Sequence, residues 1–155
     1  AAGFECRAEI DEPTAANAAL QIRDGAVVDV GGGTTGIAVF RDGKAIYTAD
    51  EATGGTHFTL VIAGALNISF EDAEKLKTNA REQDRLYPLV RPVMEKVATI
   101  VARHILHHDV ETIYLVGGTS SFVGIAAVVE EITGIKTQVP AKPLFVTPLG
   151  IAMND

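Results

Sequence analysis

The chain has 155 residues, of which 47% are hydrophobic and 21% are charged, and its formal net charge is -7. This length and composition indicate one globular domain with a sizeable core. The acidic balance argues against non-specific binding to nucleic acid or to an anionic membrane, because both depend on dense lysine and arginine. The single cysteine, Cys6, excludes an intramolecular disulfide, and no apolar run resembles a membrane span or a signal peptide. We therefore expect a cytoplasmic protein with no nucleic-acid or membrane partner.

The first third of the chain predicts one helix among several strands. Pro13 suits a first helical turn, and the alanine-rich segment that it opens runs to Leu20. Short β-branched and apolar runs predict strands, and Asp42-Gly43 is a typical hairpin turn. The expected strands cover residues 4–10, 26–30, 35–40 and 44–50.

The rest of the chain predicts mainly helices. Ser69 and Asp72 have the spacing of a capping box, and a long apolar stripe predicts a helix with Pro88 and Pro92 in its first turns. The expected helices cover 53–66, 69–78, 88–107, 123–133 and 148–152, with strands at 112–116 and 136–139. These elements predict an α/β fold, in which a mixed central sheet has helices on both faces.

The most informative motif is an apolar strand that ends in an acid, three glycines and two threonines. Its residues are Val27-Val28-Asp29-Val30-Gly31-Gly32-Gly33-Thr34-Thr35. Glycines let backbone N–H groups approach an anion closely, and threonine hydroxyls add donors at the same place. A carboxylate at the end of a buried strand is unfavourable unless a cation or hydrogen bonds compensate it. The motif therefore indicates a phosphate site, with Asp29 acting on hydrated Mg²⁺ or on an attacking water; a glycine-rich turn without function is the alternative.

The same glycines also match the pattern of a dinucleotide-binding fold. Glu51 lies about twenty residues beyond them, as that fold requires. However, a dinucleotide site needs a helix to begin at the glycines, whereas residues 35–40 have the composition of a strand. We therefore expect a hairpin, and a helix over residues 33–40 would restore the dinucleotide interpretation.

Five motifs occur in an order that resembles the ATPase superfamily of actin, sugar kinases and DnaK-type chaperones. They are Glu12-Pro13-Thr14-Ala15-Ala16-Asn17, the strand and loop from Val28 to Thr35, Gly54-Gly55, the pair Glu74 and Lys77, and Val116-Gly117-Gly118-Thr119-Ser120. The resemblance covers nearly the whole chain. Within the superfamily, the chain resembles the chaperone-like EutJ family of ethanolamine utilization. The implied fold is a ribonuclease H-like lobe of the actin type.

The resemblance implies ATP and Mg²⁺ as cofactors and gives each motif a role. Asp29 and Glu12 match the carboxylates that act on metal and water near the γ-phosphate, and Asp29 would bind Mg²⁺ through water. Glu74 and Lys77 match a pair that contacts ribose and adenine, and 148–152 matches a helix that crosses between lobes. The loops that would hold the phosphates and adenosine contain Gly31, Gly32, Gly33, Thr34, Thr35, Gly117, Gly118, Thr119 and Ser120.

Members of the superfamily have two lobes, and this chain matches only the second. We therefore expect an isolated lobe, produced by deliberate truncation or by proteolysis, whose partner is the first lobe of the same polypeptide. ATP hydrolysis is expected only when groups converge from both lobes. The resemblance also implies a client enzyme in ethanolamine metabolism and association with a bacterial microcompartment. A small-molecule kinase, a nucleotide-gated scaffold and a module that has lost nucleotide binding remain alternatives.

Three other features carry less functional weight. His104 and His108 are four residues apart, but no third metal ligand has a matching spacing, and histidines favour a helix C-terminus. Residues 81–85 are charged enough to form an exposed connection. Cys6 has no neighbouring base and is expected to be a buried thiol rather than a nucleophile.

Overall fold

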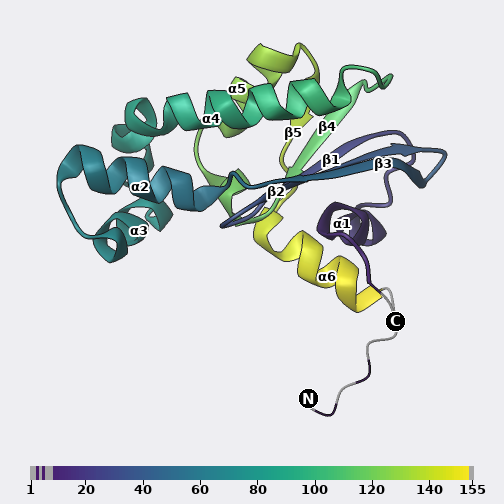
Figure 1. Cartoon of the computed structure of the whole chain (residues 1–155), viewed down its shortest axis with the longest axis horizontal. Coiled ribbons are helices and arrows are strands. Elements are labelled where there is room, and N and C mark those ends of the chain that lie inside the picture. The colour runs from purple at the N-terminus through teal and green to yellow at the C-terminus, as the bar shows by residue number, and fades with distance from the viewer. Residues whose placement is uncertain (1–2, 4, 6–8, 154–155) are drawn as a thin grey trace.

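The fold is built on a mixed sheet of five strands in the order β3-β2-β1-β4-β5 (Figure 1). The computed structural model describes residues 3, 5 and 9–153. Strand β1 pairs in antiparallel fashion with β2 and in parallel with β4, so it lies at the centre of the sheet. The strands are β1 (Gly25–Val30), β2 (Thr35–Arg41), β3 (Lys44–Glu51), β4 (Thr112–Val116) and β5 (Lys136–Gln138).

Helices cover both faces of this sheet, as the sequence predicts. In Figure 1, α4 and α5 lie above the strands and α1 and α6 lie below them, while α2 and α3 extend to one side. The α-helices are α1 (Glu12–Leu20), α2 (Gly55–Leu66), α3 (Phe70–Thr78), α4 (Gln83–Ile105), α5 (Ile125–Thr133) and α6 (Val146–Met153). Two short 3-10 turns, η1 (Gly118–Ser121) and η2 (Pro143–Phe145), precede α5 and α6.

The glycine loop leads into a hairpin and not into a helix. Strand β2 begins at Thr35, and Asp42 and Gly43 connect it to β3 with positive φ angles of 52° and 78°. Two consecutive left-handed residues match the right-handed twist of a hairpin, which explains the Asp-Gly sequence. The hairpin prediction is confirmed, and the dinucleotide interpretation is excluded.

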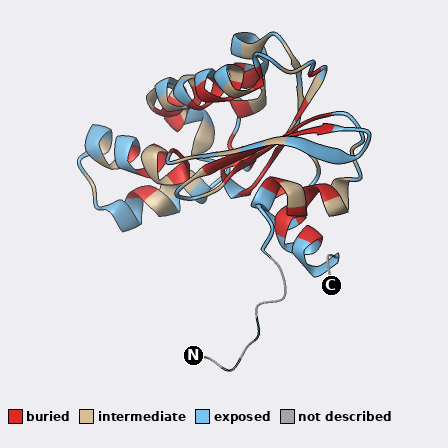
Figure 2. Ribbon diagram, turned by 45° about the vertical axis from the view of Figure 1, so that its right-hand side comes forward, coloured by how far each residue is buried: buried red, intermediate tan, exposed pale blue. Residues whose placement is uncertain are grey.

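The two sides of strand β1 pack against two separate apolar clusters. Alternate residues Ala26, Val28 and Val30 belong to the large cluster that includes α4, whereas Val27 belongs to a smaller one beside α1 and α6. All six residues of β1 are buried, and Figure 2 shows this buried centre between more exposed outer surfaces. Asp29 shares the face of Val27 because side chains alternate along a strand. Burial of the strand therefore places a carboxylate inside the fold.

The long helix begins earlier than expected. The sequence places its start at Pro88, whereas α4 begins at Gln83 and contains Pro88 and Pro92 in its interior. The expectation of an exposed connection over residues 81–85 is thus wrong from Gln83 onward. Proline is commonest in a first turn, but the fully buried Leu86 packs the additional turn into the core.

The expected strand over residues 4–10 lies mostly outside the described residues, as does Cys6. Glu9 and Ile10 are described, and they are exposed and outside any strand. The last helix also begins at Val146, before the proline that was used to predict its start. Within the described part of the chain, no helix is both long enough and apolar enough to cross a membrane.

Candidate functional site

A cavity of about 600 Å³ lies where β1 and β4 end. It brings together segments from five separate parts of the sequence: the start of α1, the first glycine loop, α3 with the start of α4, the second glycine loop, and η2 with α6. The lining residues are Glu12, Asp29, Gly31, Gly32, Glu74, Lys77, Thr78, Gln83, Gly117, Gly118, Thr119, Ser121, Phe122, Leu144, Thr147, Pro148 and Ile151. Most of the residues predicted from the sequence therefore share one cavity.

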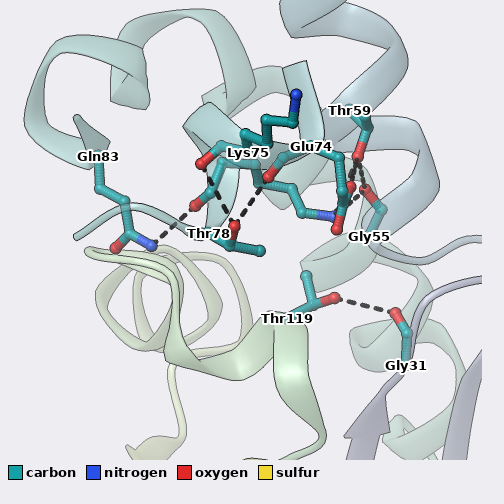
Figure 3. Close-up of polar contacts among 9 residues, drawn as sticks. Gly31, Gly55, Thr59, Glu74, Lys75, Thr78, Gln83 and Thr119 are labelled. Carbon is teal, nitrogen blue, oxygen red and sulfur yellow. Dashed lines mark hydrogen bonds and ion pairs between the residues drawn. The ribbon is translucent and has the colours of Figure 1, made fainter. Parts of the chain in front are cut away.

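The two glycine loops contact each other across the end of the sheet. The Thr119 hydroxyl donates a hydrogen bond to the carbonyl of Gly31 at 2.9 Å, as Figure 3 shows. The first turn of α2 holds the same loop, because Gly55 and Thr56 donate from their backbones to the carbonyls of Gly31 and Gly32. The carbonyls thus point toward protein donors. Among the described residues, the N–H groups of Gly32 and Gly33 have no partner.

Asp29 is the buried carboxylate of the site. Its side chain is only 4% exposed, and its Oδ2 accepts a hydrogen bond from the hydroxyl of Thr147 at 2.5 Å. Burial raises the pKa of Asp29 above its ordinary value, and the hydrogen bond from Thr147 opposes this shift only in part. An ionised Asp29 would therefore gain from a nearby cation.

Glu12 adds a second carboxylate at the start of α1. Asp11 caps this helix by accepting from the backbone N–H of Thr14, which leaves Glu12 in its first turn at the edge of the cavity. Partial burial raises the pKa of Glu12, and the negative charges of Asp29 and Asp50 raise it further. Repulsion among these acids shows that negative charge accumulates on this side of the cavity.

Glu74 and Lys77 line the cavity from α3 and form a compact network with Thr59 of α2, and Figure 3 shows Glu74 and Thr59 beside Gly55. The Lys77 ammonium lies 2.7 Å from Glu74 Oε2 and donates to Thr59 Oγ1 at 3.0 Å and to the Gly55 carbonyl at 3.2 Å. The Thr59 hydroxyl also donates to Glu74 at 2.5 Å. Burial raises the pKa of Glu74, but the hydrogen bonds and charge of Lys77 and Thr59 outweigh it and leave the pKa below its ordinary value.

This network predicts an acid-dependent contribution of Glu74 to stability. Glu74→Gln should lower the free energy of unfolding by about 1 kcal/mol at neutral pH, because a partly exposed, hydrogen-bonded pair is lost. A lowered folded-state pKa gives stability that is present above the unfolded-state value near 4.5 and is lost as the pH falls through the folded-state value. Urea unfolding across pH measures this difference, which should disappear in acid.

Glu71→Gln is the matched control, because Glu71 is an exposed acid in the first turn of the same helix. It should change stability less than Glu74→Gln at neutral pH. A Glu74→Gln effect that persists below the folded-state pKa would contradict an ionic origin.

Four of the predicted site residues do not line the cavity: Gly33, Thr34, Thr35 and Ser120. The Thr35 hydroxyl is fully buried and donates to the carbonyl of Thr53 at 2.6 Å. The Ser120 hydroxyl donates to the carbonyl of Val116 at the same distance. Both hydroxyls therefore support the loops from within, and the predicted ligand contacts of these four residues remain predictions.

Four polar residues that line the cavity were missed in the sequence: Thr78, Gln83, Ser121 and Thr147. Thr147 contacts Asp29, which is 118 positions away, and no local motif marks such a contact. The amide of Gln83 donates to the Lys77 carbonyl and accepts from the N–H of Val123, each at 3.0 Å. Gln83 thus connects the end of α3 to the loop before α5. The sequence predicts an exposed connection over residues 81–85, so it assigns Gln83 no role in the site.

The strand order and the position of the cavity define an α/β domain with the actin-like ATPase fold. A family profile described as "Cell division protein FtsA" matches residues 26–150, and the chain belongs to this family. The predicted resemblance to EutJ is also confirmed. Ethanolamine utilization protein EutJ of Escherichia coli strain K12 is 44% identical over 99% of this chain and 55% of its own length.

Solved structures support the same relationship. The structure of EutJ from Carboxydothermus hydrogenoformans superposes with a TM-score of 0.90 and is 49% identical, covering 94% of this chain and 55% of that one. MreB5 of Spiroplasma citri bound to ADP has a TM-score of 0.83 but only 16% identity, over 99% of this chain and 61% of its own, so it shows the fold alone. This chain spans about half the length of the EutJ proteins that it matches.

Proposed function

We propose that this chain is the second nucleotide-binding lobe of an ATP-dependent, chaperone-like protein of ethanolamine utilization. The remaining length of its EutJ relatives would supply the first lobe. The cleft between the lobes would bind Mg-ATP, and closure of the lobes would act on a client enzyme of the pathway. We place this activity in the cytoplasm, with association to a bacterial microcompartment.

The observation that carries the proposal is the convergence of acids and phosphate-binding backbone in one cavity. Asp29 and Glu12 lie on its acidic side and have raised pKa values, a state that a cation would relieve. Gly32 lines the cavity, so its unpartnered N–H group is available to phosphate oxygens, and the N–H group of Gly33 beside it also has no partner among the described residues. A bound Mg²⁺ would neutralise phosphate charge and order water, which is the chemistry that phosphoryl transfer needs.

The part of the cavity around Glu74 fits a nucleoside. Glu74 offers a carboxylate to ribose hydroxyls, and Lys77 holds that carboxylate in place through the network with Thr59. Phe122, Leu144 and Ile151 add apolar surface to the lining, against which a base would pack. The volume of about 600 Å³ lies within the range of small-molecule sites, which supports a ligand of nucleotide size.

Turnover assays on the full-length protein distinguish the chaperone from its alternatives. We expect slow ATP hydrolysis that an added ethanolamine-pathway enzyme accelerates, because client binding would favour lobe closure. A matched control replaces that enzyme with an unrelated protein of similar size. Stoichiometric phosphorylation of a metabolite would overturn the proposal in favour of a kinase, and absent nucleotide binding would favour a simple binding module.

A further inference from the structure

Among the described residues of α6, Thr147 alone makes a side-chain hydrogen bond to the acidic side of the cavity. Its hydroxyl donates to Asp29 Oδ2, and the two residues are 7% and 4% exposed. We propose that Thr147 is a positioning residue, which fixes the orientation of the Asp29 carboxylate toward a hydrated divalent cation in the cavity. The inference rests on the proposed function, because the cation would accompany the nucleotide.

The second oxygen of the carboxylate is located by Gly117. This glycine has a φ of 87°, and a Cβ atom at its position would collide with Asp29 Oδ1. Oδ1 therefore lies against the backbone of a residue that lines the cavity. Thr147 binds Oδ2 and Gly117 lies beside Oδ1, so the orientation of the Asp29 carboxylate is fixed at both oxygens.

The support for Thr147 is itself rigid. Helix α6 crosses α1 so closely that a Cβ on Gly150 would overlap the backbone of Ala15. Helix α1 carries Glu12 in its first turn, and α6 carries Thr147. The close crossing of α1 and α6 thus fixes the relative positions of Glu12 and Thr147. A buried hydrogen bond on a rigid element is the arrangement that holds a functional carboxylate in one geometry.

Replacement of Thr147 separates positioning from folding. Thr147→Val removes the hydroxyl and keeps the branched shape, whereas Thr147→Ser keeps the hydroxyl. In the full-length protein, calorimetry should measure ATP affinity once with Mg²⁺ and once with EDTA. We expect Thr147→Val to reduce the gain in ATP affinity from Mg²⁺ by about threefold, within the few-fold change expected when the Asp29 charge itself is removed, because a charged hydrogen bond orients the carboxylate. Thr147→Ser should retain that gain and melt near the wild-type temperature, whereas Thr147→Val should stay folded but melt a few degrees lower, because a buried carboxylate loses its hydrogen-bond donor.

If Mg²⁺ increases the ATP affinity of Thr147→Val as much as that of wild type, the inference is overturned. An equal loss of affinity with Mg²⁺ and with EDTA would do so too, because it would indicate a purely structural role. If wild type binds no ATP, the proposed function fails, and the carboxyl carbon resonance of Asp29 in the 155-residue chain decides the inference separately. That resonance should shift in Thr147→Val and stay in place in Thr147→Ser; no shift in Thr147→Val contradicts positioning.

Discussion

Asp29→Asn in the full-length protein is expected to slow ATP hydrolysis by about 100-fold or more while ATP affinity changes only a few-fold. The reason is that the carboxylate would act on metal and water, whose charge distribution changes most in the transition state. Asn has nearly the same shape and can still accept the hydrogen bond from Thr147. The buried surroundings of Asp29 should therefore persist. Single-turnover hydrolysis, together with calorimetric binding, measures the two quantities separately.

Asp109→Asn provides a matched control, because Asp109 is an exposed carboxylate outside the cavity. It should hydrolyse ATP at the wild-type rate. Equal turnover in Asp29→Asn and wild type would remove Asp29 from the mechanism. A loss of binding as large as the loss of turnover would instead assign Asp29 to ground-state binding.

The isolated chain is expected to bind Mg-ATP about a thousandfold more weakly than the full-length protein. Millimolar or undetectable affinity for the chain and micromolar affinity for the parent differ by this factor. The reason is geometric, since the glycine loops of this chain would contact only one side of a nucleotide, and contacts from both proposed lobes would add only in the full-length protein. Calorimetry on both proteins under identical conditions provides the comparison.

Mg-ADP should show a smaller difference between the two proteins, because fewer phosphate contacts would come from the first lobe. Equal Mg-ATP affinities in the chain and in its parent would show that the second half of the supposed cleft contributes nothing. That result would contradict the two-lobe proposal even if the cavity itself binds nucleotide.

Local sequence features were sufficient to predict the hairpin and the buried strand that carries Asp29. Asp42-Gly43 specifies a turn with two positive φ angles, and uninterrupted burial of β1 follows from its apolar composition. The start of α4 was missed because proline frequency points to Pro88, whereas burial of Leu86 determines the actual boundary. Tertiary packing decided this boundary, and packing partners are not visible in a local pattern.

The candidate site was predictable where a motif is continuous and unpredictable where it is assembled in space. Asp29 and the glycines beside it are contiguous, so their chemistry can be read directly from the chain. Thr147 and Gln83 belong to the site only through contacts with residues that are distant in the sequence. Thr147 contacts Asp29, and Gln83 contacts Val123. The hydroxyls of Thr35 and Ser120 belong to the motifs but bond to backbone carbonyls, a distinction that composition does not reveal.

Replacement of Gly32 tests most directly whether this cavity binds nucleotide. A Cβ at Gly32 meets no atom within 4 Å, so Gly32→Val should fold normally, yet its branched side chain would stand where a phosphate must approach the backbone. Gly64→Val is the matched control, because Gly64 is equally unobstructed but lies on the exposed side of α2. In calorimetric titration of the full-length protein with Mg-ATP, we expect Gly32→Val to weaken binding by at least about tenfold and Gly64→Val to match wild type. Wild-type affinity in a folded Gly32→Val protein would contradict the central claim.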